Sequence, residues 1–339
     1  MGNQTFQIRH RGVGDSNPVF IVAEAGINHQ GNVERALDLV DAVADSGADA
    51  IKFQTIDPDA SYVPGTESHD VFSGKELNRE EYEQIIDRCN DNDLIFFTTP
   101  GDFPSLSLCE ELNVPAIKIS SGLMTNYPLI QKALALEVPL LISTGASYMW
   151  EVEKLMSFLD RHGAPPYALL HCVSSYPAPD ASLCLEVVSE LNQRTPYPVG
   201  YSDHNLNDEA CLGAVALGAK VIEKHITLDR NQSGEDHHIS LEPDSFGELV
   251  SRIRTMETMT ASRVKQPQEE EGTFRQQYRR KITASREIEE GEVIKRDAVR
   301  CMRHSEPGGL APEQLDEVIE RQAVRDIAKY NLITWESIR

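Results

Sequence analysis

Residues 19–54, VFIVAEAGINHQGNVERALDLVDAVADSGADAIKFQ, contain the repeating unit from which the fold is predicted. The runs at 19–24 and 50–54 are short and apolar on both faces, as strands of a parallel sheet covered on both sides are. Between them, the apolar residues of 33–46 recur at helical spacing, and Gly47 ends the pattern. The stretch therefore predicts two parallel strands joined by a helix.

The same alternation continues through the first 260 residues. Six further strand-like runs lie at 94–98, 116–119, 139–143, 167–171, 199–202 and 220–225, and helical patterns lie at 79–90, 103–112, 151–162 and 209–217. Eight strand–helix units in about 250 residues are typical of a (β/α)8 TIM barrel. A doubly wound open sheet is the alternative, but no GxGxxG follows the first strand, and eight units are many for an open sheet. We therefore predict an α/β protein with a (β/α)8 barrel at 1–261.

The pattern changes after the barrel. Residues 262–278 are polar and charged, which predicts a linker. Residues 279–339 contain short strands, glycine-containing turns and one helix around 312–319. A domain this small is expected to gain stability by docking or by dimerisation.

Composition limits the partners and the compartment. The chain has 339 residues, 32 Lys and Arg against 54 Asp and Glu, and a net charge of −22. Such an acidic surface repels nucleic acid and anionic lipid, so neither partner is expected, and an anionic substrate would need a local group of cations. No apolar run reaches the roughly 20 residues of a membrane helix, and the first residues lack a signal core. Six scattered cysteines without a CxxC pair indicate reduced thiols in a cytoplasmic protein.

Polar residues end nearly every predicted strand. Because barrel active sites form at the C-terminal ends of the strands, and because buried charges are costly unless paired or used, these residues predict a catalytic rim. Two lysines and several hydroxyls of this rim would suit a phosphorylated, carboxylated small molecule. The alternative is that each lysine pairs with a neighbouring carboxylate, for example Lys52 with Glu24. The rim residues are Glu24, Lys52, Gln54, Thr98, Thr99, Lys118, Ser120, Ser121, Ser143, Thr144, His171, Ser202, Asp203, His204, Glu223, Lys224 and His225.

His204 and His225 end consecutive strands, so their imidazoles can converge on one point. Two neutral imidazoles with open positions suit a divalent transition metal that also binds water and a substrate oxygen; two satisfied core histidines are the alternative. Glu24 could act as a base or orient a water. Asp236 could accept hydrogen bonds from a sugar or cap a turn.

The runs that carry these residues resemble those of the N-acetylneuraminate (sialic acid) synthase family. They include AEAGINH at 23–29, KFQT at 52–55, KISSG at 118–122, NYPLI at 126–130, GYSDH at 200–204 and EKH at 223–225. The last 60 residues or so resemble the antifreeze-like (SAF) domain of that family. The resemblance extends in order over nearly the whole chain.

The resemblance implies a transferase that condenses phosphoenolpyruvate with an N-acylated amino-sugar aldehyde. The product would be a nine-carbon 2-keto-3-deoxy acid, released together with phosphate. His204 and His225 would hold Mn2+, or alternatively Mg2+ or Co2+, and Glu24 would be the acid/base carboxyl. Phosphoenolpyruvate would contact Lys52, Thr99, Lys118, Ser121, Ser143 and Ser202, and the sugar would contact Gln54, Tyr176 and Asp236.

Two positions bear on the second substrate. The family forms domain-swapped homodimers, which makes Arg303 the residue expected to reach the sugar bound by the partner subunit, although residues 304–309 form a longer turn than the usual Arg-Pro-Gly. Leu123 stands where the family usually has an acidic residue that contacts the sugar. We therefore predict a less polar pocket that favours a deoxy or diacetamido sugar over N-acetylmannosamine.

Other functions remain open from the sequence. A Schiff-base aldolase would use Lys118 or Lys224 as its nucleophile. A related polysaccharide-biosynthesis synthase would use a different aldehyde. A non-enzymatic protein would use the C-terminal domain to bind ice or carbohydrate.

Overall fold

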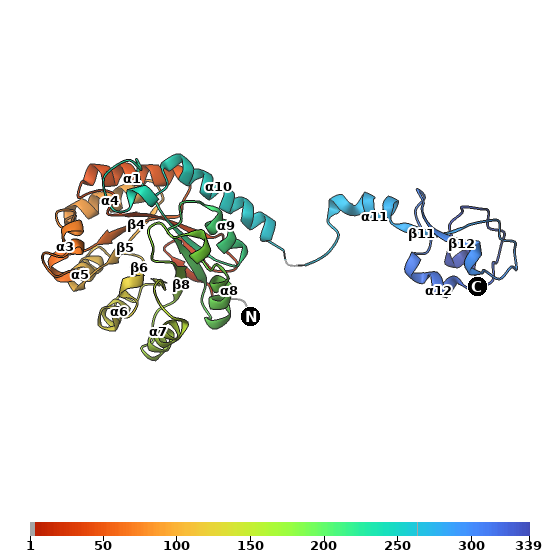
Figure 1. Cartoon of the computed structure of the whole chain (residues 1–339), viewed down its shortest axis with the longest axis horizontal. Helices are drawn as coiled ribbons and strands as arrows, with labels where there is room; N and C mark the ends of the chain where they lie inside the picture. Colours follow the sequence, from red (N-terminus) through yellow and green to blue (C-terminus); the bar gives the residue numbers. More distant parts are fainter. Residues whose placement is uncertain (1–3, 263) are drawn as a thin grey trace. The chain divides into compact units, whose positions relative to one another are not determined.

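The computed structural model describes residues 4–262 and 264–339. The first three residues and Arg263 of the predicted linker lie outside the described residues. The chain divides into two compact units, Met1–Ser262 and Arg263–Arg339, which are described separately (Figure 1).

The first unit is a closed barrel of eight parallel strands, as predicted. Neighbouring strands pair in chain order, and the last strand closes the barrel against the first. The strands are β3 (Phe20–Gly26), β4 (Ala50–Thr55), β5 (Ile95–Pro100), β6 (Ile117–Ile119), β7 (Leu140–Ser143), β8 (Tyr167–Cys172), β9 (Val199–Asp203) and β10 (Val221–His225).

Helices surround the barrel (Figure 1). In α1, Asn32 caps the first turn by accepting from the Arg35 backbone, and Gly47 ends the helix with a left-handed φ of 77°. The principal helices are α1 (Val33–Ser46), α4 (Arg79–Asp91), α5 (Phe103–Glu111), α6 (Tyr127–Leu134), α7 (Met149–Arg161), α8 (Glu186–Arg194), α9 (Glu209–Ala216) and α10 (Pro243–Thr260). Two short helices, α2 (Pro58–Ser61) and α3 (Glu67–Phe72), lie in the segment between β4 and α4.

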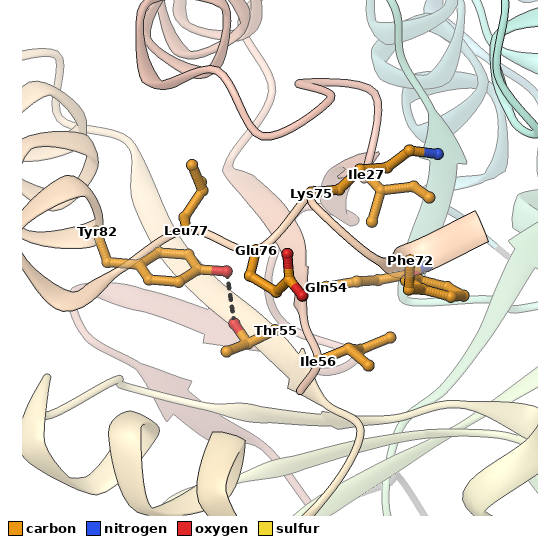
Figure 2. A pocket seen from close by; sticks show the side chains of 9 residues that line it. All are labelled: Ile27, Gln54, Thr55, Ile56, Phe72, Lys75, Glu76, Leu77 and Tyr82. Carbon is orange, nitrogen blue, oxygen red and sulfur yellow. Dashed lines mark hydrogen bonds between the residues drawn. The ribbon is translucent and has the colours of Figure 1, made fainter. Parts of the chain in front are cut away.

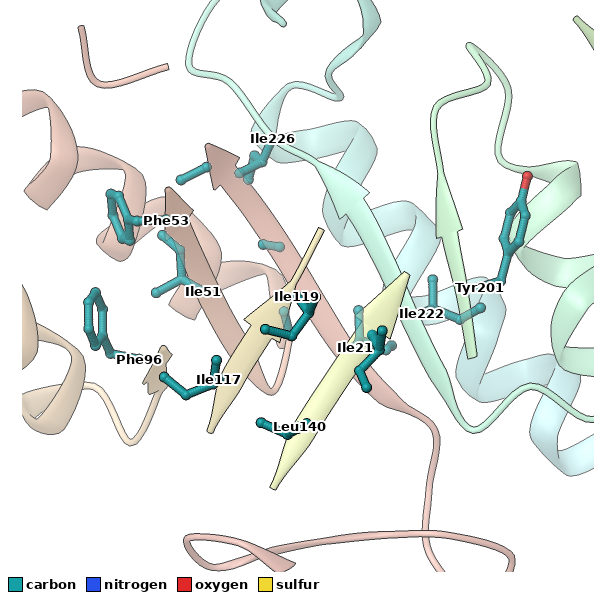
Figure 3. Close-up of a cluster of buried hydrophobic side chains, with 14 of the residues drawn as sticks. Ile21, Ile51, Phe53, Phe96, Ile117, Ile119, Leu140, Tyr201, Ile222 and Ile226 are labelled. Atoms are coloured by element: carbon teal, nitrogen blue, oxygen red, sulfur yellow. The ribbon is translucent and has the colours of Figure 1, made fainter. Parts of the chain in front are cut away.

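Side chains alternate along each strand between the barrel interior and the helix layer. Outward residues such as Ile21, Ile51 and Ile222 pack under the helices (Figure 3). The N-terminal halves of the strands fill the interior with a separate apolar cluster, to which the hairpin β1 (Phe6–Ile8) and β2 (Arg11–Val13) also belongs. The hairpin therefore packs against the N-terminal end of the barrel. The cluster consists of Phe6, Ile8, Val13, Phe20, Val22, Ala50, Ile95, Phe97, Ala116, Leu141, Ala168, Leu170 and Val221.

The second unit has its own small core. Strand β11 (Arg280–Ala284) pairs antiparallel with β12 (Val299–Arg303), and α12 (Leu315–Val318) follows. Its buried residues include Ile282, Ile288, Ile294, Val318, Ile327 and Ile333. Within the predicted linker, α11 (Gly272–Tyr278) forms two helical turns, so part of that segment is ordered.

Two further observations concern the whole described chain. All six cysteines are free thiols. Among residues 4–262 and 264–339, every helix is too short or too polar to cross a lipid bilayer.

Candidate active site

The alternation that fills the barrel with apolar residues continues to its C-terminal end, where the inward residues become polar. Glu24 lies two residues after Val22, and Lys52 two residues after Ala50, so both point into the barrel. The same spacing relates Lys118 to Ala116 and Glu223 to Val221. The inward or strand-end polar residues, all buried, are Glu24, Lys52, Thr99, Lys118, Ser143, Ser202, His204, Glu223 and His225.

Two lysines and two glutamates form a buried ionic cluster at the centre of this end. Lys52 Nζ lies 2.5 Å from Glu24 Oε2 and 3.8 Å from Glu223 Oε2, and Lys118 Nζ lies 3.1 Å from Glu223 Oε1. Lys52 also donates to Thr99 Oγ1 at 2.9 Å. The Glu24–Lys52 pair, which was the alternative to a substrate contact in the sequence analysis, is therefore present, as one part of a larger cluster of two lysines and two glutamates.

Hydroxyl and amide groups complete this cluster. Ser202 Oγ donates to Glu223 Oε1 at 2.9 Å, and Gln54 Nε2 donates to Glu24 Oε1 at 3.1 Å. Ser143 Oγ is buried without a hydrogen-bond partner among the described residues. Since an unpaired buried hydroxyl is costly, Ser143 is available to a bound ligand.

The two carboxyls of the cluster differ in acidity. Burial raises the pKa of Glu24, and Lys52 offsets this only in part. Burial acts in the same direction on Glu223, but Lys118 and Lys52 outweigh it and lower the pKa of Glu223 to about 2. Glu24 is therefore the carboxyl suited to exchange a proton, whereas Glu223 remains the fixed counter-charge of the lysines.

The lysines differ as well. Burial lowers the pKa of Lys118. For Lys52, Glu223 and Glu24 outweigh burial and raise the pKa. Both ammonium groups can neutralise an anion within an otherwise acidic protein.

The imidazoles of His204 and His225 converge, with ring centroids 5.4 Å apart. His204 Nδ1 lies 2.9 Å from the Val173 carbonyl, so that nitrogen carries the proton and Nε2 keeps its lone pair. His225 Nδ1 is buried without a hydrogen-bond partner among the described residues, and Asp236 Oδ2 lies 3.7 Å away. Burial, together with His204, lowers the pKa of His225 well below its ordinary value, so this ring is neutral.

This donor set fits a divalent metal ion. Two imidazoles, each coordinating through an unprotonated nitrogen, would leave coordination positions for water and substrate oxygens, as catalytic sites require. In 4–262 and 264–339 no group of three or more His, Cys, Asp or Glu side chains is clustered as a complete ligand set. The two histidines would therefore hold an ion whose remaining coordination positions are filled by substrate and water.

Cys172 is a neighbour of this pair that the sequence did not single out. Its Sγ lies 3.7 Å from His204 Nδ1 and accepts from Ser121 Oγ at 3.5 Å. Burial would lower the pKa of His204, but its contacts with Cys172 outweigh burial and raise it. A metal ion bound by His204 would compete with the proton that this raised pKa favours on the imidazole.

The loops above the strands add the remaining predicted residues. Tyr176 is half exposed. Its ring centroid lies 4.1 Å from that of His204, with the two ring planes tilted relative to each other, and 6.2 Å from that of His225. Ser121 Oγ accepts from the Gly145 backbone at 3.0 Å. A Cβ on Gly145 would lie 2.2 Å from Ser174 Oγ, so only glycine permits this close approach.

A small pocket adjoins this site beside Gln54 (Figure 2). Apolar side chains of Ile27, Ile56 and Phe72 form part of its wall, and the carboxylate of Glu76 points into it. Thr55 Oγ1 donates to the Tyr82 hydroxyl at 2.9 Å. The remaining lining residues are Lys75 and Leu77.

Four further residues considered from the sequence have the following contacts. His171 points outward, and its Nε2 lies 2.7 Å from the Leu183 carbonyl. Lys224 also points outward, is fully buried and pairs with Asp203, so it does not reach the barrel interior as a Schiff-base lysine would need to. Leu123 is half-buried in a 3₁₀ turn (Ser121–Leu123) and packs against the outer core. Arg303, in the second unit, stacks its guanidinium 5.0 Å from the centroid of the Tyr278 ring.

Sequence reasoning missed the role of Glu223, although a signal was present. Glu223 lies two residues before His225, so the period of the strand places both on the inward face and Lys224 on the opposite face. The same count from Leu170 gives Cys172. Side-chain parity along each strand therefore identifies both residues.

Comparisons with known proteins agree with the resemblance noted from the sequence. The model of the NeuB family matches residues 39–265, and that of the SAF domain matches residues 279–339. The N,N'-diacetyllegionaminic acid synthase of Legionella pneumophila is 33% identical, over 96% of this chain and 96% of its own length. The N-acetylneuraminate-9-phosphate synthase of Drosophila melanogaster is 32% identical, over 94% of this chain and 96% of its own length.

A solved structure gives the same result. The N-acetylneuraminic acid synthetase of Leptospira borgpetersenii, determined in complex with citrate, matches with a TM-score of 0.77 and 34% identity, covering 80% of this chain and 94% of that chain. The family match over most of the barrel and relatives above 30% identity over nearly the whole chain lead to one conclusion: this chain belongs to the NeuB family and ends in a SAF domain.

Proposed function

We propose that this chain condenses phosphoenolpyruvate with an N-acylated amino-sugar aldehyde to give a nine-carbon 2-keto-3-deoxy acid and phosphate. The observation that carries the proposal is the buried Lys52–Lys118 pair beside the two converging imidazoles. The names of the relatives, which are synthases of sialic-type acids, support the same class of reaction.

Phosphoenolpyruvate would bind over the ionic cluster. Lys52 and Lys118 would neutralise its phosphate and carboxylate, and the Ser143 hydroxyl would donate to one of its oxygens. The unpartnered Ser143 hydroxyl supports this placement, because a ligand oxygen would give it the partner it lacks. The other hydroxyls of this subsite are Thr99, Ser121 and Ser202.

A divalent ion held by His204 and His225 would supply Lewis-acid polarisation of the aldehyde oxygen, with Mn2+ preferred over Mg2+ or Co2+. C3 of phosphoenolpyruvate forms a bond to the aldehyde carbon, water adds at C2, and the C2–O bond to phosphate breaks. The new hydroxyl needs one proton, which Glu24, whose pKa is raised by burial, can give, and the attacking water releases one proton on adding to C2, which Glu24 can recover. The other proton of the water leaves with the phosphate as the C2 carbonyl forms.

Gln54, Tyr176 and Asp236 would contact the sugar. Gln54 links the ionic cluster to the adjoining pocket, and Tyr176 and Asp236 lie beside the two histidines. The free cysteines support a reducing compartment, and we place the reaction in the cytoplasm.

Phosphate release from phosphoenolpyruvate across a panel of amino sugars, with mass spectrometry of the product, tests this function. One or more sugars should give a product heavier by the three-carbon unit of pyruvate. Activity that survives EDTA, together with borohydride trapping of a lysine adduct, would instead show a Schiff-base aldolase at Lys118. If none of the sugars releases phosphate, the protein is not a synthase of this kind.

The same panel tests the sugar preference. If Leu123 borders the sugar, a hydroxyl of N-acetylmannosamine left unpaired costs about 1–3 kcal/mol, and a 6-deoxy-diacetamido sugar loses less. We expect wild type to have the higher kcat/KM for the deoxy sugar, and Leu123→Glu to shift the ratio toward N-acetylmannosamine. An unmoved ratio would agree instead with the packing of Leu123 against the outer core.

We further propose a domain-swapped homodimer in which Arg303 reaches the sugar bound by the partner subunit. Phe274, Tyr278 and Arg303 are exposed and stacked: the two aromatic ring centroids lie 4.7 Å apart, and the Arg303 guanidinium lies over the Tyr278 ring. This supports an interface, because aromatic and arginine side chains are typical of interface centres.

Truncation after Gln268 tests the homodimer. The barrel has its own core, so the shortened chain should fold, but as a monomer with little activity toward the amino sugar. Arg303→Ala in the full chain should raise the KM for the sugar without changing the oligomeric state. Light scattering and kinetics measure both, and a fully active truncated monomer would exclude the arrangement.

A further inference from the structure

A buried ion pair joins the residues that immediately precede the two histidines. Asp203 precedes His204 and Lys224 precedes His225, and the two are direct register partners on strands β9 and β10. Lys224 Nζ lies 2.6 Å from Asp203 Oδ2, and neither side chain is exposed. Because side chains alternate along a strand, this pair points toward the helix layer while the imidazoles turn toward the barrel interior.

The Asp203 carboxylate uses both oxygens. Oδ1 accepts from the Tyr201 hydroxyl at 2.9 Å and from the Asn205 backbone at 3.0 Å. Oδ2 accepts from Cys211 Sγ at 3.4 Å as well as from Lys224. The carboxylate is therefore saturated by contacts from β9, β10, α9 and the loop after β9.

Lys224 holds the same loop from the other side. Its ammonium group donates to the backbone carbonyls of Asn205 and Asn207, in addition to Asp203. All three donors of the ammonium group are used within the protein, so Lys224 has none left for a substrate. The pair thus fixes the backbone that directly follows His204.

The network continues to the loop that carries Tyr176. Asn205 Nδ2 donates to the Ala178 carbonyl at 2.7 Å and to Asp180 Oδ1 at 2.8 Å, and the Ala178 backbone donates to the His204 carbonyl at 2.9 Å. The loop that carries Tyr176, whose ring lies beside that of His204, is therefore held by the same hydrogen-bond network as the backbone of His204.

We propose that Asp203 and Lys224 are a positioning pair that sets the spacing of the His204 and His225 rings and thereby the affinity of the site for a divalent ion. Burying an ion pair is a poor way to gain stability, and fixing a register is the best-attested use of one. Outer groups that orient metal ligands typically change metal affinity about 10–100-fold when removed. The inference rests on the proposed metal site at these two histidines.

Mn2+ binding to the full chain, followed by electron paramagnetic resonance of the free ion, tests this inference. The main variant is Asp203→Asn/Lys224→Met, which removes both charges together and leaves no unpaired buried charge. We expect its Kd for Mn2+ to rise about 10–100-fold. Tyr201→Phe removes only one hydrogen bond to Asp203 and should weaken Mn2+ binding less.

Arg254→Met is the matched control. It breaks an ion pair between Arg254 Nη2 and Asp49 Oδ2, 2.9 Å long, at the N-terminal end of β4, the end of the barrel opposite the histidines. The control should lower the melting temperature without changing the Kd for Mn2+. If the Kd for Mn2+ depended only on general stability, it would change alike in Asp203→Asn/Lys224→Met and in Arg254→Met. A positioning role predicts a change in Asp203→Asn/Lys224→Met alone.

Each result is decisive. If wild type binds Mn2+ and the folded double variant binds it within about twofold of wild type, the positioning role is wrong while the metal site stands. If wild type does not bind Mn2+, the proposed metal site itself fails. If the double variant does not fold, Tyr201→Phe decides: weaker binding than in Arg254→Met supports the pair, and equal binding overturns it.

Discussion

Replacing either histidine of the converging pair should nearly abolish turnover. Either substitution, His204→Ala or His225→Ala, would remove one of the two proposed ligands of the metal ion, and the Lewis-acid contribution of such an ion is worth several kcal/mol. Since each 1.4 kcal/mol or so is tenfold in rate, we expect kcat/KM to fall by about 1,000-fold or more. EDTA should have the same effect on wild type, and Mn2+, Co2+ or Mg2+ should restore the wild type but not the variants.

The measurement is phosphate release under saturating phosphoenolpyruvate. His162→Ala is a suitable control, because His162 contacts the Phe158 carbonyl at the end of α7, on the outside of the barrel. This control should keep full activity and the same response to EDTA. Full activity of His204→Ala without added metal would contradict the metal assignment.

The barrel was predictable because its strands are apolar on both faces. A run such as 139–143 has no polar residue until its end, so both the strand and the end at which the chemistry lies are visible in the sequence. The helices were predicted less completely. Helices α6, α8 and α10 were not among the predicted patterns, and length does not explain this, because α10 has 18 residues whereas the predicted α9 has 8.

The hairpin at the N-terminal end of the barrel was not predicted for a related reason. Strands β1 and β2 have 3 residues each, and their buried residues Phe6, Ile8 and Val13 stand among polar neighbours. Two apolar positions in alternation do not distinguish a strand from a loop. Only the tertiary contact with the barrel interior shows why they are apolar.

The rim was predictable as a set, whereas most of the contacts within it, other than the Glu24–Lys52 pair, were not. In the run Glu223-Lys224-His225 the sequence shows three ionisable residues, and the strand period divides them between the two faces. Neither the ionic cluster of Lys52, Lys118, Glu24 and Glu223 nor the outward Asp203–Lys224 pair follows from composition, because each depends on the register between neighbouring strands.

Removal of either lysine of the ionic cluster should weaken phosphoenolpyruvate binding, with different effects on stability. A charged contact is worth about 1.5–3 kcal/mol, so Lys118→Met should raise the KM for phosphoenolpyruvate about 10- to 150-fold. In that variant Glu223 keeps Ser202 as a donor and Lys52 at 3.8 Å, so its charge remains compensated. The melting temperature of Lys118→Met should therefore fall only modestly.

Lys52→Met should weaken binding equally and also destabilise the barrel. Lys52 is the nearest cation to the buried Glu24 carboxylate, at 2.5 Å, and losing one partner of a buried pair costs about 3–5 kcal/mol. Adding Glu24→Gln removes the uncompensated charge, so the double variant should recover thermal stability but not phosphoenolpyruvate affinity. Lys132 is the control residue, because its ammonium group donates to Ser107 outside the barrel, and Lys132→Met should change neither the melting temperature nor the KM for phosphoenolpyruvate.

An unchanged KM for phosphoenolpyruvate in both Lys52→Met and Lys118→Met would show that the lysines serve only the two glutamates. If Lys52 were purely structural, the Lys52→Met/Glu24→Gln variant would recover both its melting temperature and its affinity for phosphoenolpyruvate. Recovery of the melting temperature alone would therefore identify Lys52 as a substrate contact.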